Sequence, residues 1–336
     1  MVKQQEVPRT LDDQTPATAP ASWQRKHVLD VDDFSVEEIE LVMTTTDAMR
    51  EVLGRDVPRV PALRGTTVVN LFYENSTRTR TSFELAGKAL GADVVNIAAS
   101  ASSVTKGESL IDTVRTVQAL GAQVVVMRHP SSGAPYVAAR NSELSFINAG
   151  DGWHAHPTQA LLDLYTLRQT VGSVRGRKVV ICGDITHSRV ARSNMWTLTA
   201  MGAEVTVSGP PTLIPRELTC ASEGLLPPVG VDYDFERALE KAEIVMMLRL
   251  QAERQQAGLL PSLREYAQLY QLTDERLAMA APGAVVMHPG PMNEGVEIAA
   301  SVAHGARSLI EPQVQNGVAV RMALLYLLAG RQRSEA

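Results

Sequence analysis

The sequence has few of the residues that mark secreted or nucleic-acid-binding proteins. It contains only 2 cysteines among 336 residues, too few for a disulfide framework, and Cys182 and Cys220 lack the spacing of a zinc site. Lys and Arg number 32 against 37 Asp and Glu, so the chain has no global basic field to attract nucleic acid. These absences favour a protein of the reducing cytoplasm that does not bind nucleic acid.

Long apolar runs are also missing. The first 22 residues contain no continuous apolar segment of the signal-peptide type, and their composition predicts a flexible tail. The run VAVRMALLYLLAG near the C-terminus is interrupted by Arg321 and is shorter than the roughly 18 residues of a membrane span. We therefore expect no export and no membrane association, and a buried helix at the C-terminal end.

The rest of the sequence alternates helical patterns with short apolar runs. These runs are TTVVNLFY, ADVVNIA, AQVVVMR, KVVICGD, AEVTVSG, AEIVMML and GAVVMHP. Strands that are apolar on both faces are typical of parallel sheets covered by helices on each side. A chain of 336 residues is long enough for about two such domains. The pattern predicts an α/β fold with two domains, each a parallel β-sheet flanked by helices.

The segment VVNLFYENSTRTRTSFELAGKALGA runs from a buried strand through a polar turn into a helix. Ser76, Thr77, Arg78 and Thr79 occupy the turn and the first helical turn. Backbone N–H groups, hydroxyls and a guanidinium at that place can bind phosphate. A serine cap followed by solvated arginines is the alternative, but two arginines interleaved with hydroxyls after a buried strand favour the anion site.

Further polar residues follow other predicted strands or begin helices. Arg128 and Arg249 follow apolar runs, at the edge where open α/β sheets bind ligands, and Arg189 stands near a helix start. His156 precedes Pro157, a favoured first residue of a helix. Taken singly, each has an ordinary structural explanation. Gly183 stands alone without a GxGxxG pattern, so a dinucleotide fold is the weaker interpretation.

Five motifs then occur in a set order: STRTRTSFE, MRHP, HPTQALLDL, MLRLQAER and HPGP. With them the chain resembles the aspartate/ornithine carbamoyltransferase family, and within it the aspartate-specific members, from about His27 to the last helix. The resemblance implies transfer of a carbamoyl group from carbamoyl phosphate to L-aspartate, giving N-carbamoyl-L-aspartate and phosphate, an early step of pyrimidine synthesis. It implies direct attack by the amine, with no metal and no cofactor.

The resemblance also implies a division of the chain. After the tail of residues 1–22, residues 23–155 would bind carbamoyl phosphate, and the C-terminal helix of residues 312–336 would complete that domain. Residues 156–311 would bind aspartate and include the linking helix. Two interdomain helices would join the two domains.

Residue roles follow from the same motifs. By resemblance, the contacts to carbamoyl phosphate come from Ser76, Thr77, Arg78, Thr79, Ser102, Arg128, His156, Gln159, Gly290 and Pro291. Of these, Arg78, Thr79, Arg128 and His156 would carry catalysis. The contacts to aspartate would come from Lys106, Arg189, Arg249 and Gln251. Ser103 stays open as an alternative to Ser102, and Arg80, His129 and His154 are given no role.

Partners and alternatives complete the prediction. The resemblance implies a homotrimer with shared active sites, in which Ser102 and Lys106 enter the site of a neighbouring chain, and a higher assembly with dihydroorotase or regulatory chains stays open. One alternative is a carbamoyltransferase for ornithine or another amine. Arg249, Gln251 and the lack of a cysteine in HPGPMNEG argue against it. The other is a noncatalytic scaffold for pathway enzymes.

Overall fold

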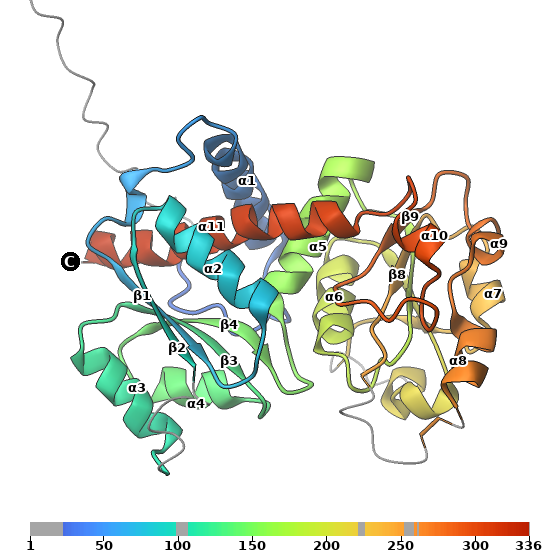
Figure 1. The fold of residues 1–336 in the computed structure, drawn as a ribbon, viewed down its shortest axis with the longest axis horizontal. Helices are drawn as coiled ribbons and strands as arrows, with labels where there is room; N and C mark the ends of the chain where they lie inside the picture. Colours follow the sequence, from blue (N-terminus) through green and yellow to red (C-terminus); the bar gives the residue numbers. More distant parts are fainter. Residues whose placement is uncertain (1–22, 99–106, 221–225, 252–258, 261, 336) are drawn as a thin grey trace, which may run out of the picture.

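A computed structural model describes residues 23–98, 107–220, 226–251, 259–260 and 262–335. The predicted tail over residues 1–22 lies outside the described residues. Two α/β lobes lie side by side, with helix α5 (Pro157–Val171) between them (Figure 1).

The first lobe is built on a four-stranded parallel sheet of order β2-β1-β3-β4. Its elements are α1 (Val36–Leu53), a 3₁₀ turn (Pro61–Leu63), β1 (Thr67–Phe72), α2 (Thr77–Ala89), β2 (Asp93–Ala98), α3 (Leu110–Ala119), β3 (Val124–His129), α4 (Ala134–Arg140) and β4 (Ser145–Asp151). Alternation along β1 explains why helices cover both faces. Val68 and Phe72 pack into the core with α1 and α2, whereas Val69 and Leu71 pack with α3 and α4.

The second lobe contains a five-stranded parallel sheet of order β7-β6-β5-β8-β9. Its elements are β5 (Lys178–Cys182), α6 (Arg189–Ala200), β6 (Glu204–Ser208), 3₁₀ turns (Pro211–Leu213 and Arg216–Thr219), β7 (Gly230–Val231), α7 (Phe235–Leu239), β8 (Ile244–Met247), α8 (Leu263–Tyr270), α9 (Asp274–Leu277), β9 (Val285–Met287) and α10 (Ala300–Ala303). Two parallel sheets flanked by helices confirm the predicted fold class.

Two long helices connect the lobes. Helix α11 (Ile310–Glu335) starts beside the second lobe and packs against α1, α2 and α5 (Figure 1). Every residue of α5 from Pro157 to Leu167 is buried, as expected for a helix enclosed by protein on all sides. None of the described helices combines the length and apolar character of a membrane span.

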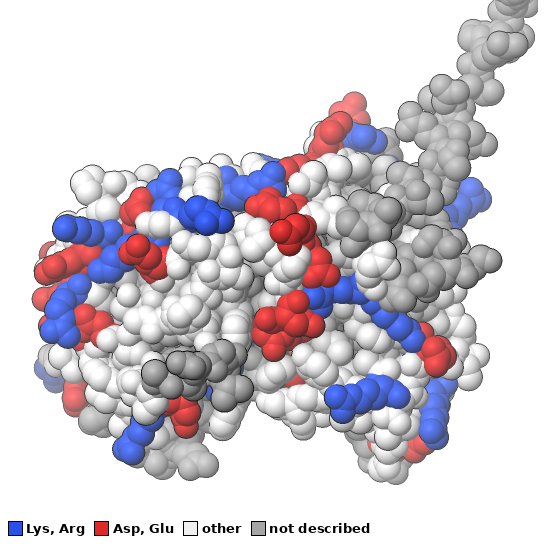
Figure 2. All heavy atoms as spheres, turned by 180° about the vertical axis from the view of Figure 1, so that it is seen from behind, with Lys and Arg blue, Asp and Glu red and all other residues white. Residues whose placement is uncertain are grey.

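The molecular surface carries charges of both signs. Figure 2 shows acidic and basic side chains interspersed over the face opposite the view of Figure 1. Charges of neither sign are therefore gathered at one place on this face.

Candidate active site

A cavity of about 510 Å³ is lined by residues of both lobes. It brings together the predicted site residues Ser76, Thr77, Arg78, Thr79, Arg128, His156, Gln159, Arg189, Arg249, Gln251, Gly290 and Pro291. The predicted residues Ser102 and Lys106, with the alternative Ser103, lie outside the described residues. Side chains separated by more than 200 positions in the sequence thus share one concave surface, the ordinary form of a small-molecule site.

The first wall of the cavity is the start of α2. Ser76 is the N-cap residue, and its Oγ accepts a hydrogen bond from the Thr79 N–H at 3.4 Å. Thr77 and Arg78 follow in the first turn, where backbone N–H groups have no helical partner. Ser76 therefore both caps the helix and lines the cavity, so its role as a cap does not exclude anion binding.

Arg78 reaches across to the second lobe. Its guanidinium lies so close to Gly290 that a Cβ at that position would come within 2.5 Å of Arg78 Nη1, and Gly290 has a φ of 61°. Burial and the nearby charge of Arg249 lower the pKa of Arg78. Two guanidinium groups from different lobes thus face the same space, where an anion would relieve their repulsion.

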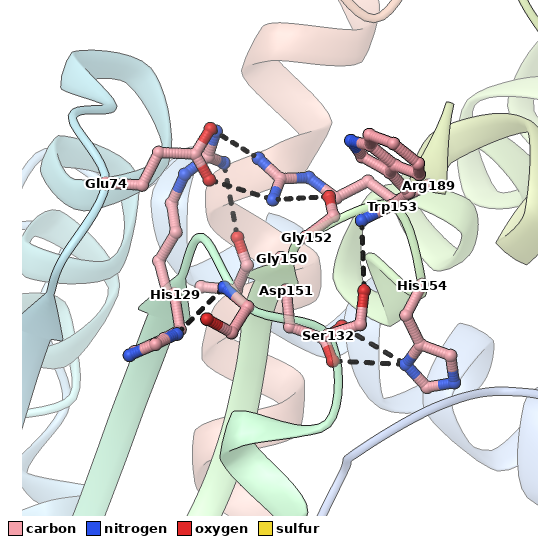
Figure 3. A network of polar contacts seen from close by, with 12 residues as sticks. Glu74, His129, Ser132, Gly150, Asp151, Gly152, Trp153, His154 and Arg189 are labelled. Carbon is pink, nitrogen blue, oxygen red and sulfur yellow. Dashed lines mark hydrogen bonds and ion pairs between the residues drawn. The ribbon is translucent and has the colours of Figure 1, made fainter. Parts of the chain in front are cut away.

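The carboxylate of Glu74 joins two further cavity arginines, Arg128 and Arg189, and Figure 3 shows its contact with Arg189. Arg128 Nη2 donates to Glu74 Oε1 at 3.2 Å, while Arg189 donates to both Glu74 oxygens, at 2.9 and 3.2 Å. Arg128 Nη1 also donates to the carbonyl of Ala149, and Arg189 Nη1 to that of Gly152. Glu74 therefore binds a strand-end arginine of the first lobe and a helix-start arginine of the second.

Glu74 is a site residue that the sequence analysis missed. It stands two residues before Ser76, in YENSTRTR. The available signal was charge balance, because several arginines brought into one cavity need a counter-charge.

His156 and Gln159 occupy the start of α5. His156 is the N-cap residue, is almost fully buried, and donates its backbone N–H to Ser193 Oγ at 2.9 Å. Gln159 follows one turn later and also lines the cavity. His154 lies elsewhere: it contacts Asp151 at 3.1 Å, which raises its pKa, and also contacts Asp30. His154 is not among the cavity residues.

The HPGP segment is held by its own histidine. His288 Nδ1 accepts the N–H of Gly290 at 2.8 Å, so the ring proton must sit on Nε2, which faces Glu297 Oε1 at 3.3 Å. Burial lowers the pKa of His288, which favours this neutral form. The ring thereby fixes the turn that carries Gly290 and Pro291.

Other cavity residues were also unassigned in the sequence analysis. They are Asn75, Ser82, Leu162, Ser188, Val190, His288, Pro289, Ile310, Gln313, Val314 and Arg321. Asn75, Ser188, Val190 and Pro289 each adjoin a predicted residue in the sequence. Ile310, Gln313, Val314 and Arg321 come from α11 and reach the cavity only through the fold. The described residues contain no group of three or more His, Cys, Asp or Glu that can hold a metal ion.

Family models match nearly the whole described chain. Residues 26–169 match the aspartate/ornithine carbamoyltransferase carbamoyl-P binding domain, and residues 175–328 match the Asp/Orn binding domain of the same family. The chain belongs to the aspartate/ornithine carbamoyltransferase family. Both halves of the cavity therefore lie in segments that the family models cover.

Carbamoyltransferase relatives are similar over almost their full length. The aspartate carbamoyltransferase catalytic subunit of Roseiflexus sp. (strain RS-1) is 61% identical over 91% of this chain and 96% of the relative. The subunit of the same name from Dehalococcoides mccartyi (strain CBDB1) is 54% identical over 96% of this chain and 98% of the relative.

Solved carbamoyltransferase structures share the fold. Aspartate transcarbamoylase from Trypanosoma cruzi, in complex with carbamoyl phosphate and aspartate, has a TM-score of 0.81 and 29% identity, covering 94% of this chain and 99% of that one. Ornithine carbamoyltransferase from Pyrococcus furiosus has a TM-score of 0.79 and 26% identity, covering 90% and 97%. Since carbamoyltransferases named for either acceptor have this fold, acceptor choice has to be argued from side chains.

Proposed function

We propose that this chain transfers the carbamoyl group of carbamoyl phosphate to L-aspartate, yielding N-carbamoyl-L-aspartate and phosphate for pyrimidine synthesis. The observation that carries the proposal is the meeting of the Ser76–Thr79 motif with Arg249 and Gln251 in one cavity. The first suits a phosphate and the second a carboxylate. The high identity to aspartate carbamoyltransferase catalytic subunits supports the same conclusion.

Charge matching supports these substrates. The phosphate group of carbamoyl phosphate and the two carboxylates of aspartate bring about four negative charges. Arg78, Arg128, Arg189 and Arg249 line the cavity, and Glu74 offsets part of their charge. Arginine suits both anions because its planar fork forms paired hydrogen bonds with carboxylate and phosphate oxygens.

The proposed reaction is a direct displacement. The aspartate amine attacks the carbamoyl carbon, so that the new N–C bond forms while the bond from that carbon to the phosphate oxygen breaks. Thr79, Arg128 and His156 stabilise the developing oxyanion, and the α2 start with Arg78 stabilises the departing phosphate. Gln159 and the Gly290–Pro291 segment hold the carbamoyl NH₂. Catalysis then comes from positioning and electrostatics, without a metal, cofactor or covalent enzyme intermediate.

Acceptor choice provides the first test. With carbamoyl phosphate as donor, we expect kcat/KM for aspartate to exceed that for ornithine by on the order of 10³, because the ornithine ammonium would face Arg249 and be repelled by its like charge. Steady-state assays with both amines measure this ratio. Preference for ornithine would reject the aspartate assignment, and no transfer to either amine would favour a noncatalytic scaffold.

The homotrimer with shared sites is also part of the proposal. Strand β2 is an edge strand, and its Val95 is 46% exposed, an arrangement that natural proteins commonly cover. The segment with Ser102 and Lys106 directly follows this strand in the sequence. Both cysteines are free, which suits the proposed cytoplasmic location.

Mixing of two inactive variants tests the shared sites. Lys106→Ala and Arg189→Ala proteins are each expected to be nearly inactive. After dissociation and reassembly as a mixture, about one site in four of a closed ring receives intact Lys106 from one chain and intact Arg189 from its neighbour. Activity near a quarter of the wild-type value should therefore return. Mixed trimers confirmed by mass spectrometry that stay inactive would show that both residues act within one chain.

A further inference from the structure

A buried carboxylate lies directly behind the cavity. Asp163, on α5, is fully buried and accepts hydrogen bonds from three side-chain amides. Gln159 Nε2 and Gln313 Nε2 donate to its Oδ1, at 2.9 and 2.7 Å, and Asn194 Nδ2 donates to its Oδ2 at 2.8 Å. The three amides come from α5, α11 and α6, so one side chain joins both linking helices to the second lobe.

This carboxylate determines how the Gln159 amide is turned. An ionised carboxylate only accepts hydrogen bonds, so the NH₂ group of Gln159 must face Asp163. The Oε1 of Gln159 is then the end of the amide that faces away from Asp163, and Gln159 lines the cavity. Gln159 can therefore offer its Oε1 to the cavity as a hydrogen-bond acceptor.

The Gln313 amide is fixed at both ends. Its Nε2 donates to Asp163, and its Oε1 accepts the backbone N–H of His288 at 3.1 Å. His288 begins the segment that continues to Gly290 and Pro291 in the cavity wall. Asp163 therefore acts on a second part of the cavity, since it orients the amide that holds this segment.

Resting on the proposed function, we propose that Asp163 is a positioning residue that selects a carbamoyl over an acetyl donor. A carbamoyl group presents an NH₂ where an acetyl group presents a methyl. A hydrogen-bond acceptor that faces this position is paired by the NH₂ of a carbamoyl group. The methyl of an acetyl group leaves it unpaired. Asp163 imposes this turn on Gln159 without touching the substrate.

The charge of Asp163 is costly to bury and is only partly compensated. Burial raises its pKa to about 6, against the lowering effects of its three amide donors and of Arg321. Arg321 is itself buried, and its guanidinium lies 5.1 Å from the centroid of the Phe83 ring. At pH 8 the carboxylate is ionised, so that pH suits the test. Apolar residues in place of Asp163 and all its amide partners would avoid this cost, which points to a role beyond packing.

The test compares two donors at pH 8. Carbamoyl phosphate and acetyl phosphate are each supplied with aspartate, and the ratio of their kcat/KM values is measured. In both reactions the amine forms a bond to the carbonyl carbon as the bond to phosphate breaks. Asp163→Leu keeps a similar side-chain volume but removes both acceptor oxygens. We therefore expect the ratio of carbamoyl phosphate to acetyl phosphate kcat/KM values to fall at least about tenfold. Asp163→Asn keeps one acceptor oxygen for the three amide donors, and we expect a smaller loss of at least about threefold.

Two further variants separate the explanations. Asn194→Ala removes an amide that binds the same carboxylate but does not line the cavity, and it should leave the ratio unchanged. Gln159→Leu removes the acceptor itself and should lower the ratio as Asp163→Leu does.

The outcomes are distinct once folding is checked by circular dichroism. A folded Asp163→Leu protein whose activity with both donors falls in parallel overturns the proposal, because a merely structural role predicts that result. If that variant does not fold, Asp163→Asn decides alone, and a wild-type ratio overturns the proposal. An unchanged ratio in Gln159→Leu would also overturn the proposal, because it would show that the Gln159 acceptor does not select the donor. Transfer to aspartate by the unmodified protein tests the proposed function separately.

Discussion

Replacement of Arg78 by alanine is expected to lower kcat/KM for carbamoyl transfer by on the order of 10² or more. Arg78 is the cationic side chain of the α2 start, lies against Gly290 of the other lobe, and shares the cavity with Arg249. Removing a preorganised donor from a developing anion has effects of this size. Steady-state kinetics on the purified variant, with its fold checked by circular dichroism, measure the loss.

Arg80→Ala is the matched control. Arg80 lies two residues further along the same helix and is not among the cavity residues. Its replacement should leave kcat/KM within about twofold, since it removes a cation outside the site. A folded Arg78→Ala protein with near-normal kcat/KM would reject the phosphate site.

Replacement of Arg249 by alanine is expected to act on aspartate rather than on carbamoyl phosphate. Arg249 follows β8 in the second lobe, whereas the phosphate-binding motif belongs to the first. Loss of a charge-assisted pair to a substrate carboxylate costs roughly 2 to 5 kcal/mol, so KM for aspartate should rise by more than about 30-fold. Equilibrium dialysis should find carbamoyl phosphate binding nearly intact.

Arg237→Ala serves as the control for Arg249→Ala. Arg237 is an exposed arginine of the same lobe, paired with Asp232 and absent from the cavity wall. Its loss should alter neither ligand. Equal weakening of both ligands in Arg249→Ala would contradict the division of substrates between the lobes.

Much of the fold could be predicted because buried parallel strands appear in the sequence as short apolar runs. Each of the seven runs contains a strand of the structure. Strand β4 was not predicted because Asn148, Gly150 and Asp151 interrupt its apolar pattern. These polar groups are buried and are paired partly with other segments: Asn148 Nδ2 donates to Asp151 Oδ1 and to the carbonyl of Leu29, and the Gly133 N–H donates to Asp151 Oδ2. Hydrogen bonds between distant segments leave no periodic signal.

The candidate site shows the same limit. Ser76, Arg78 and His156 could be found because they stand at helix starts within recognisable motifs. Glu74 and Asp163 could not, because their importance lies in partners that are distant in the sequence. Glu74 meets Arg189, 115 positions away, and Asp163 meets Gln313, 150 positions away. Such pairings depend on how the lobes are placed, which the order of elements alone does not determine.

The two linking helices have a consequence for the stability of the whole chain. Leu161 of α5 and Leu324 of α11 belong to one continuous core that also contains Val68 of the first sheet and Val179 of the second. Removing either lobe would expose apolar surface of the other. We therefore expect the lobes to unfold together, and a ligand bound at either side of the cavity to stabilise both sheets against heat and denaturant.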